Sequence, residues 1–134
     1  MYTFLWLSVI MKILGIDDNK DLLELCNVAL SSAGHEYTAI DNSKEGLQAI
    51  KDKKFDLVLL DLSMPDFSGE DVLDALVKEG IINKQKIIIF SAYSSTENAT
   101  LLEKGVHSII KKPVEIDILI ETIKKMPSDV SNSN

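Results

Sequence analysis

A short apolar run that ends in an acid is the feature that most constrains the fold of this chain. Residues 57–60 are all apolar, Asp56 precedes them, and Asp61 ends the run before a loop that contains Pro65. A run of this length, bounded by charge and by proline, is typical of a β-strand that is covered on both faces. In open α/β sheets, ligands bind at the carboxyl ends of such strands. Asp61 is therefore expected where the chemistry of the protein takes place.

Apolar runs and amphipathic stretches alternate along the rest of the chain. Besides the strand that ends at Asp61, the pattern predicts strands over residues 12–17, 36–40, 86–90 and 107–110. A helix is predicted after each strand, within residues 18–34, 42–50, 72–80, 94–105 and 116–123. This alternation requires right-handed crossovers and a parallel sheet with helices on both faces. The predicted fold class is α/β, a doubly wound five-stranded sheet in a single domain.

The first of these helices is expected to bury one apolar face. Leu22, Leu25, Cys26, Ala29 and Ala33 recur at helical spacing. Cys26 is the single cysteine, which excludes an internal disulfide, and its place on this face indicates core packing rather than a reactive thiol. A lone thiol also fits a reducing compartment such as the cytoplasm.

Length and charge restrict the class of protein further. A chain of 134 residues with 46% hydrophobic residues can form one domain with a substantial core. Its net charge of −7 argues against direct contact with nucleic acid, because phosphate binding needs a basic surface. The sequence contains no repeat and no linker, so a second domain is not expected. Output is expected through contact with another protein.

The first ten residues are unusually apolar. They precede the expected domain, residues 11–126, which a polar tail over residues 127–134 follows. The apolar segment is too short to span a bilayer, which takes about 20 residues, and no basic segment precedes it as in a secretory signal. Three interpretations stay open: an arm that packs on the domain, a patch for self-association, or an upstream start codon with Met11 as the functional start.

Polar side chains follow four of the five expected strands: Asp17 with Asp18, then Asp61, Ser91 and Lys112. The carboxyl ends of these strands meet at one edge of the sheet. Two carboxylates about 4 Å apart repel each other by about 4 kcal/mol at an effective dielectric of about 20. A raised pKa or a divalent cation relieves such repulsion, and hard carboxylate oxygens favour Mg²⁺. Carboxylates, a metal, an ammonium and a hydroxyl together suit a phosphoryl group.

The motifs at these strand ends resemble those of the receiver domain of two-component response regulators. They are Ile16-Asp17-Asp18, Asp61 with Met64-Pro65 and Gly69, Ser91-Ala92, and Lys112-Pro113. The resemblance covers Met11 to about Met126 and implies the flavodoxin-like fold with strand order 2-1-3-4-5. It also implies that the protein is a signalling module and not an enzyme, apart from its own phosphorylation and autodephosphorylation.

The resemblance implies a metal site and a phosphoacceptor. Asp61 would accept a phosphoryl group from a sensor histidine kinase, a phosphotransfer protein or a small phosphodonor. Asp17, Asp18, Asp61 and the main-chain carbonyl of Ser63 would hold Mg²⁺.

Two further residues would handle the phosphoryl group itself. Lys112 would pair with a phosphoryl oxygen, positioned by a cis bond to Pro113. Ser91 would hydrogen-bond the phosphoryl group once Asp61 is modified. The charge change at Asp61 would then switch a surface that binds a downstream target protein.

Three positions depart from or qualify the family pattern. Ile109 stands where the family usually has Tyr or Phe, so an aromatic ring that swings between exposed and buried states is absent. Ser63 and Tyr93 flank the site, and Tyr93 is hypothesised to shield the phosphoryl group from water.

Other classes of function fit the residues less well. A phosphatase-like hydrolase with Asp61 as nucleophile would need a second acid where this chain has Ser63. A flavin protein would need a Ser/Thr/Gly-rich loop where Asp17 and Asp18 would repel a phosphate. A receiver that has lost its chemistry conflicts with the complete set of residues. A chemotaxis-type regulator and a phosphorelay intermediate both stay open.

Overall fold

The computed structural model of the protein describes residues 10–92 and 95–126. In this part of the chain five parallel strands form one sheet in the order β2-β1-β3-β4-β5. The strands are β1 (Lys12–Ile16), β2 (Glu36–Ile40), β3 (Leu57–Asp61), β4 (Ile87–Ser91) and β5 (Ser108–Lys111). The predicted flavodoxin-like fold and strand order are confirmed.

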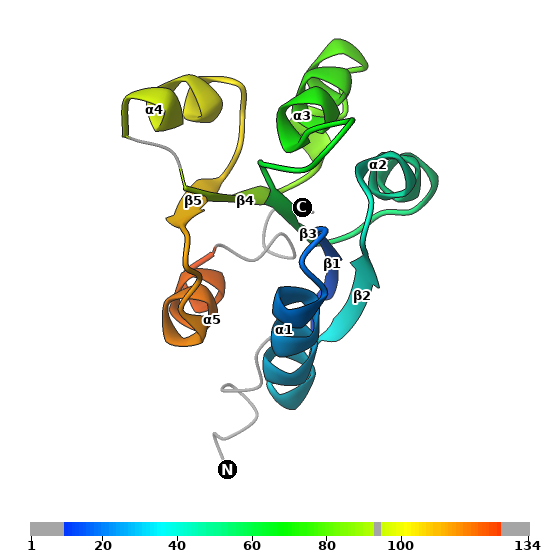
Figure 1. Ribbon diagram of the computed structural model, residues 1–134. Helices are drawn as coiled ribbons and strands as arrows, with labels where there is room; N and C mark the ends of the chain where they lie inside the picture. The colour runs from blue at the N-terminus through cyan, green and yellow to red at the C-terminus, as the bar shows by residue number, and fades with distance from the viewer. Residues whose placement is uncertain (1–9, 93–94, 127–134) are drawn as a thin grey trace, which may run out of the picture.

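Each strand is followed by an α-helix. The helices are α1 (Lys20–Ser32), α2 (Ser43–Asp52), α3 (Gly69–Lys78), α4 (Ser95–Glu103) and α5 (Ile116–Lys124), and a short 3₁₀ helix, η2 (Ile82–Lys84), precedes β4. Figure 1 shows α1 and α5 on one face of the sheet and α2, α3 and α4 on the other. The helices run back along the sheet, so their N-termini lie near the carboxyl ends of the strands.

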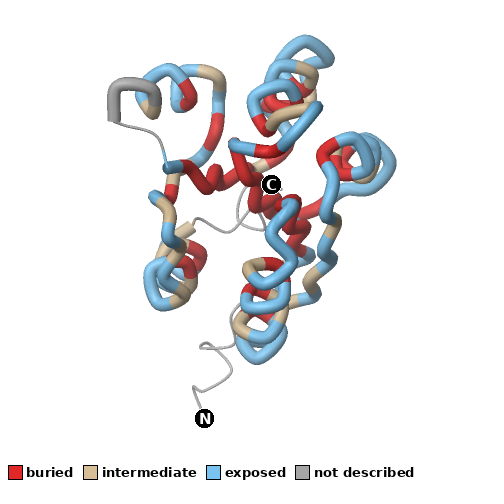
Figure 2. Tube along the Cα trace, viewed as in Figure 1, coloured by how far each residue is buried: buried red, intermediate tan, exposed pale blue. Residues whose placement is uncertain are grey.

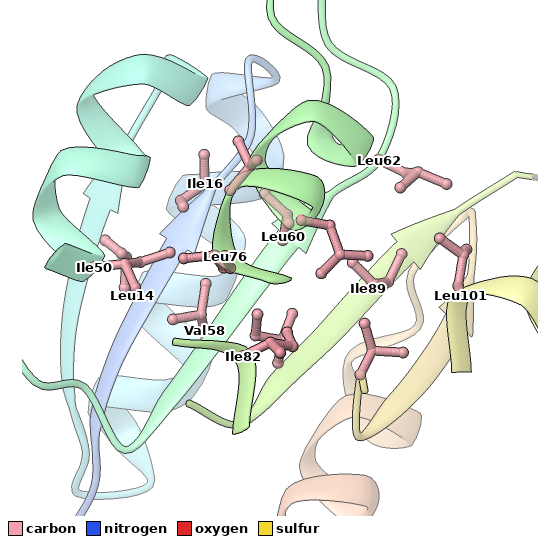
Figure 3. Close-up of a cluster of buried hydrophobic side chains, with 14 of the residues drawn as sticks. Leu14, Ile16, Ile50, Val58, Leu60, Leu62, Leu76, Ile82, Ile89 and Leu101 are labelled. Atoms are coloured by element: carbon pink, nitrogen blue, oxygen red, sulfur yellow. The ribbon is translucent and has the colours of Figure 1, made fainter. Parts of the chain in front are cut away.

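The central strands are buried on both faces, as the apolar run in β3 predicts. All five residues of β3 and all five of β4 are buried, and Figure 2 shows this buried layer between exposed helix surfaces. Alternate side chains point to opposite faces. Val58 and Leu60 pack with residues of α2 and α3 (Figure 3). Leu57 and Leu59 pack with residues of α1 and α5.

The buried face of α1 differs from the predicted one. Leu23, Cys26 and Leu30 are its buried residues, whereas Leu25 is 48% exposed. Leucines at several adjacent positions allow two helical phases, and the sheet selects the one in which positions 23, 26 and 30 face inward. The prediction for Cys26 is correct, because its side chain is buried in the core.

The domain boundaries expected from the sequence, residues 11–126, stay a prediction. Residues 1–9 of the apolar segment (residues 1–10), the polar tail (residues 127–134) and Tyr93 lie outside the described residues. Among the described residues, no helix is both long and apolar enough to cross a membrane.

Candidate functional site

The register of β1 and β3 brings two acids side by side at the carboxyl edge of the sheet. Ile16 pairs with Leu60, so Asp17 and Asp61 come next on adjacent strands. Asp17 is 2% exposed and Asp61 is 1% exposed, whereas Asp18 is exposed. Carboxylate oxygens of Asp17, Asp18 and Asp61 all lie within 4.8 Å of one another. The predicted acidic cluster is therefore present.

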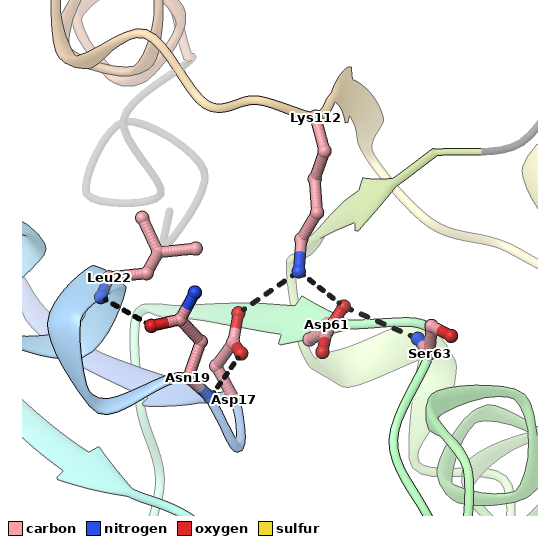
Figure 4. Close-up of polar contacts among 6 residues, drawn as sticks. All are labelled: Asp17, Asn19, Leu22, Asp61, Ser63 and Lys112. Atoms are coloured by element: carbon pink, nitrogen blue, oxygen red, sulfur yellow. Dashed lines mark hydrogen bonds and ion pairs between the residues drawn. The ribbon is translucent and has the colours of Figure 1, made fainter.

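Lys112 directly follows the carboxyl end of β5 and reaches this cluster from there. Its Nζ lies 3.0 Å from Oδ1 of Asp61 and 3.6 Å from Oδ2 of Asp17 (Figure 4). The main-chain N–H of Lys112 donates to the carbonyl of Ser91 at 2.9 Å, and the Lys112–Pro113 peptide bond is cis. One ammonium thus partly neutralises two buried carboxylates.

Burial and the crowding of charge shift the pKa values of two of these groups. Burial raises the pKa of Asp17 from 3.8 to about 6, and the charges of Asp61 and Asp18 add to the rise against the opposing effects of the Asn19 amide and Lys112. Burial alone would lower the pKa of Lys112, but its hydrogen bonds and charge interactions with Asp61 and Asp17 outweigh this and raise it. The site therefore has a deficit of positive charge near neutral pH.

Two short turns fix the carboxylates. The amide of Asn19 donates to Oδ1 of Asp17 at 2.8 Å, and Oδ1 of Asn19 accepts from the amide of Leu22 at 3.2 Å, which caps α1. The amide of Ser63 donates to Oδ1 of Asp61 at 3.3 Å (Figure 4). In each case a backbone group two residues further along the chain holds the carboxylate.

The donor set fits a small, hard divalent cation. Oδ2 of Asp61 is buried and accepts no hydrogen bond from the described residues, and the buried Oδ2 of Asp17 has only the Lys112 ammonium beside it, at the long distance of 3.6 Å. Buried carboxylate oxygens without hydrogen-bond donors are costly unless a cation binds them. Three clustered carboxylates with an exposed member, Asp18, leave room for the water ligands that Mg²⁺ retains. Asp17, Asp18 and Asp61 are therefore suited to hold Mg²⁺.

The start of α3 packs against the end of β3. A Cβ atom at Gly69 would lie 2.6 Å from the Cα atom of Leu62, so only glycine allows the helix to come this close. Ser68 and Asp71 form a reciprocal capping box at this helix start. The loop between Leu62 and Ser68 is therefore anchored where it enters α3.

The remaining predicted residues lie on the same edge or behind it. Ser91 ends β4, is buried, and follows Phe90, which pairs with Asp61. Ile109 of β5 is partly buried and packs on the core beneath α2, α3 and α4.

Sequence reasoning missed the role of Ser43. This residue is buried at the start of α2, and its hydroxyl donates to the main-chain carbonyl of Phe67 in the loop between β3 and α3. A signal was present, because Ser43 lies four and seven residues before Leu47 and Ile50, the predicted buried residues of this helix. A polar residue on a buried helix face needs a partner.

Comparison with known proteins leads to the receiver domain family that the sequence motifs resemble. The sequence model of the response regulator receiver domain matches residues 13–124. The chain is 31% identical over 112 residues to the transcriptional regulatory protein GlrR of Escherichia coli K12, which covers 83% of this chain and 25% of GlrR. It is 30% identical over 114 residues to the DNA-binding response regulator MtrA of Mycobacterium tuberculosis, which covers 84% of this chain and 49% of MtrA.

A solved structure agrees with these sequence relatives. The receiver domain of the Francisella response regulator 1452 superimposes with a TM-score of 0.78 at 32% identity, covering 85% of this chain and 93% of that one. The fold and the acidic edge define a two-component signalling module. The chain belongs to the response regulator receiver domain family. It spans between a quarter and about half of the length of the two curated relatives.

Proposed function

We propose that this protein is a phosphoacceptor receiver in which Asp61 takes up a phosphoryl group in the presence of Mg²⁺. The observation that carries the proposal is the cluster of Asp17, Asp18 and Asp61 carboxylates with Lys112 Nζ 3.0 Å from Asp61. Asp17, Asp18 and Asp61, with the main-chain carbonyl of Ser63, would hold the metal. The bound metal would neutralise charge that develops on the phosphoryl oxygens.

The transfer itself is a displacement at phosphorus. A carboxylate oxygen of Asp61 forms the new bond to phosphorus while the bond between phosphorus and the donor atom breaks. The donor atom is a nitrogen in a phosphohistidine and an oxygen in an acyl phosphate. The electron pair of the breaking bond leaves with the donor, and Asp61 becomes an acyl phosphate. Burial of Asp61 supports this role, because a poorly solvated carboxylate loses little hydration on reaction.

Lys112 and Ser91 complete the proposed chemistry. The Lys112 ammonium, now paired with Asp61 and Asp17, would transfer its contact to a phosphoryl oxygen. Ser91, buried at the end of β4, would donate a hydrogen bond to the phosphoryl group and draw its loop toward the site. The change would then reach the surface around α4, β5 and α5 through another side chain or through the backbone, because Ile109 offers no aromatic ring at the family's usual switch position.

The proposed partners follow from this chemistry. A sensor histidine kinase or a phosphotransfer protein would supply the phosphoryl group, and a target protein would bind the switched surface. The net charge of −7 supports the absence of direct contact between this chain and nucleic acid. A lone buried cysteine supports a cytoplasmic location. Both a chemotaxis-type regulator and a phosphorelay intermediate are compatible with the site.

Phosphoryl uptake tests the proposal. The full chain is incubated with Mg²⁺ and acetyl phosphate, and its intact mass is measured alongside that of Asp61→Asn. We expect the parent to gain the mass of one phosphoryl group, and neither Asp61→Asn nor the parent in EDTA to gain it. A parent that gains no mass with Mg²⁺ present contradicts the proposed function.

A further inference from the structure

The first turn of α2 contacts the chain on both sides of the acidic site, at the end of β1 and in the loop after β3. Ser43 and Gly46 lie three residues apart on the buried face of this helix. The Ser43 hydroxyl donates to the carbonyl of Phe67, on the β3 side of the site. Gly46 packs on Ile16, the residue before Asp17, so closely that a Cβ atom would lie 2.5 Å from Cδ1 of Ile16. One helical turn therefore contacts the Phe67 carbonyl on one side of the carboxylate cluster and the Ile16 side chain on the other.

The loop that Ser43 contacts borders open space. A groove of about 470 Å³ is lined by the start of α2, by the segment Met64–Phe67 and by Asp18. Within this segment Asp66 has a φ of 66°, a left-handed conformation that is uncommon for a residue other than glycine. A loop beside a groove and in an unusual conformation needs a fixed point, and the buried Ser43 hydroxyl supplies one.

Ser43 is not required to start its helix. The N-cap of α2 is Asn42, whose side chain accepts a hydrogen bond from the amide of Glu45 at 2.8 Å. The helix start is therefore satisfied by the neighbouring residue, and the Ser43 hydroxyl is directed to a residue 24 positions away. This long-range contact is the part of Ser43 that helix formation does not explain.

We propose that Ser43 is a positioning residue of the phosphorylation site. Its hydrogen bond to Phe67 holds the loop that contains the Ser63 carbonyl, so that this carbonyl and Asp61 keep their spacing from Asp17 and Asp18. Mg²⁺ demands nearly ideal octahedral geometry, so small displacements of one ligand weaken its binding. Ser43 itself touches neither the metal nor the phosphoryl group. The inference rests on the proposed function, because it assigns Ser43 to that same site.

The test separates positioning from stability. Mg²⁺ alone is titrated into the parent, Ser43→Ala and Ile50→Val, and backbone amide NMR shifts report the dissociation constant, while chemical denaturation reports stability. Ile50 is the matched control, because it is buried on the same helix seven residues beyond Ser43, and its aliphatic side chain makes no hydrogen bond to the loop. We expect Ser43→Ala to raise the Mg²⁺ dissociation constant roughly 3- to 10-fold, less than the about 10- to 100-fold typical for a residue that contacts a metal ligand directly, because Ser43 acts through the loop.

The control and two further Ser43 variants separate the effect of the hydroxyl from a general loss of stability. Ile50→Val should change the dissociation constant by less than about twofold, although it also loses stability. Ser43→Thr, which keeps a hydroxyl donor, should restore most of the affinity. If Ser43→Ala does not fold, Ser43→Cys keeps the side-chain volume with a weak donor, and the same roughly threefold threshold applies to it.

Two failures are distinguishable. If the parent takes up a phosphoryl group and Ser43→Ala binds Mg²⁺ as tightly as the parent, the role of Ser43 is overturned. A Mg²⁺ affinity that falls equally in Ser43→Ala and Ile50→Val overturns it too, since the effect would follow from stability. If the parent takes up no phosphoryl group at all, the proposed function fails instead.

Discussion

Gly69 lies directly against the strand end that carries Asp61. A Cβ atom at position 69 would lie 2.2 Å from the main-chain carbonyl oxygen of Asp61. The amide of Gly69 donates to the carbonyl of Leu62 at 3.0 Å, so the two backbones are joined as well as packed. The start of α3 thus helps to determine where the proposed phosphoacceptor lies.

Replacing Gly69 should damage both stability and phosphorylation. Gly69→Ala forces the helix and the end of β3 apart, and we expect it to lower the free energy of unfolding by about 2–3 kcal/mol. Phosphoryl uptake from acetyl phosphate should fall with it, measured at a temperature at which the variant stays folded. Gly80→Ala is the control, because Gly80 has a φ of 73° and open space around it. It should cost about 1 kcal/mol and leave phosphoryl uptake unchanged; equal phosphorylation in both variants would contradict the prediction.

Removal of the Lys112 ammonium should destabilise the protein most when no metal is present. Lys112→Met leaves the buried carboxylates of Asp17 and Asp61 without their counter-ion. Because the Lys112 side chain is 27% exposed, we expect a loss of about 1–2 kcal/mol in EDTA, less than for a fully buried pair. Mg²⁺ should reduce the difference in free energy of unfolding between Lys112→Met and the parent. The exposed neighbour Lys111→Met is the control in chemical denaturation, and equal stability of Lys111→Met and Lys112→Met in EDTA would argue against the pairing.

The raised pKa of Asp17 predicts that the stability of the metal-free protein depends on pH. The folded protein holds the Asp17 proton up to a pKa of about 6, against 3.8 for a free carboxyl. Between these values the folded state binds more protons than the unfolded state, so stability falls as pH rises through this window. Asp17→Asn should therefore stabilise the metal-free protein by about 1–2 kcal/mol above pH of about 6. The gain should vanish below pH of about 4, and Mg²⁺ should no longer stabilise the variant.

His35 should produce the opposite trend. Its Nδ1 accepts a hydrogen bond from the amide of Met11 at 3.1 Å, and burial lowers its pKa below 6.5. The unfolded state then takes up a proton first as pH falls below about 6.5, so stability is lost on acidification. His35→Gln retains an acceptor that does not titrate, and it should flatten this loss in denaturation measured from pH of about 7 to about 5. A slope identical to that of the parent would show that this hydrogen bond does not control it.

The central part of the fold could be predicted because it depends on local apolar pattern. Residues 57–60 of β3 form a continuous apolar run, from which burial on both faces was predicted, and all residues of β3 and of β4 are buried. The meeting of the acids at one edge could also be predicted, because parallel strands place their carboxyl ends on the same edge of the sheet. The register that sets Asp17 beside Asp61 came from the structure.

Tertiary contacts account for what the sequence left open. In α1, several leucines fit two helical phases, and only packing on the sheet shows that Leu23 is buried and Leu25 exposed. The partner of Ser43 lies 24 residues away, beyond the reach of helix patterns. The simultaneous pairing of Lys112 with two carboxylates likewise depends on the positions of three strands.

The identity of the modified residue shows whether Asp61 is the phosphoacceptor. After incubation with Mg²⁺ and acetyl phosphate, the protein is reduced with borohydride, which converts an aspartyl phosphate to homoserine, and the peptides are sequenced by mass spectrometry. We expect homoserine at position 61 and unmodified aspartate at positions 17 and 18. Conversion at another residue, or none at position 61 in protein that has gained a phosphoryl group, would contradict this assignment.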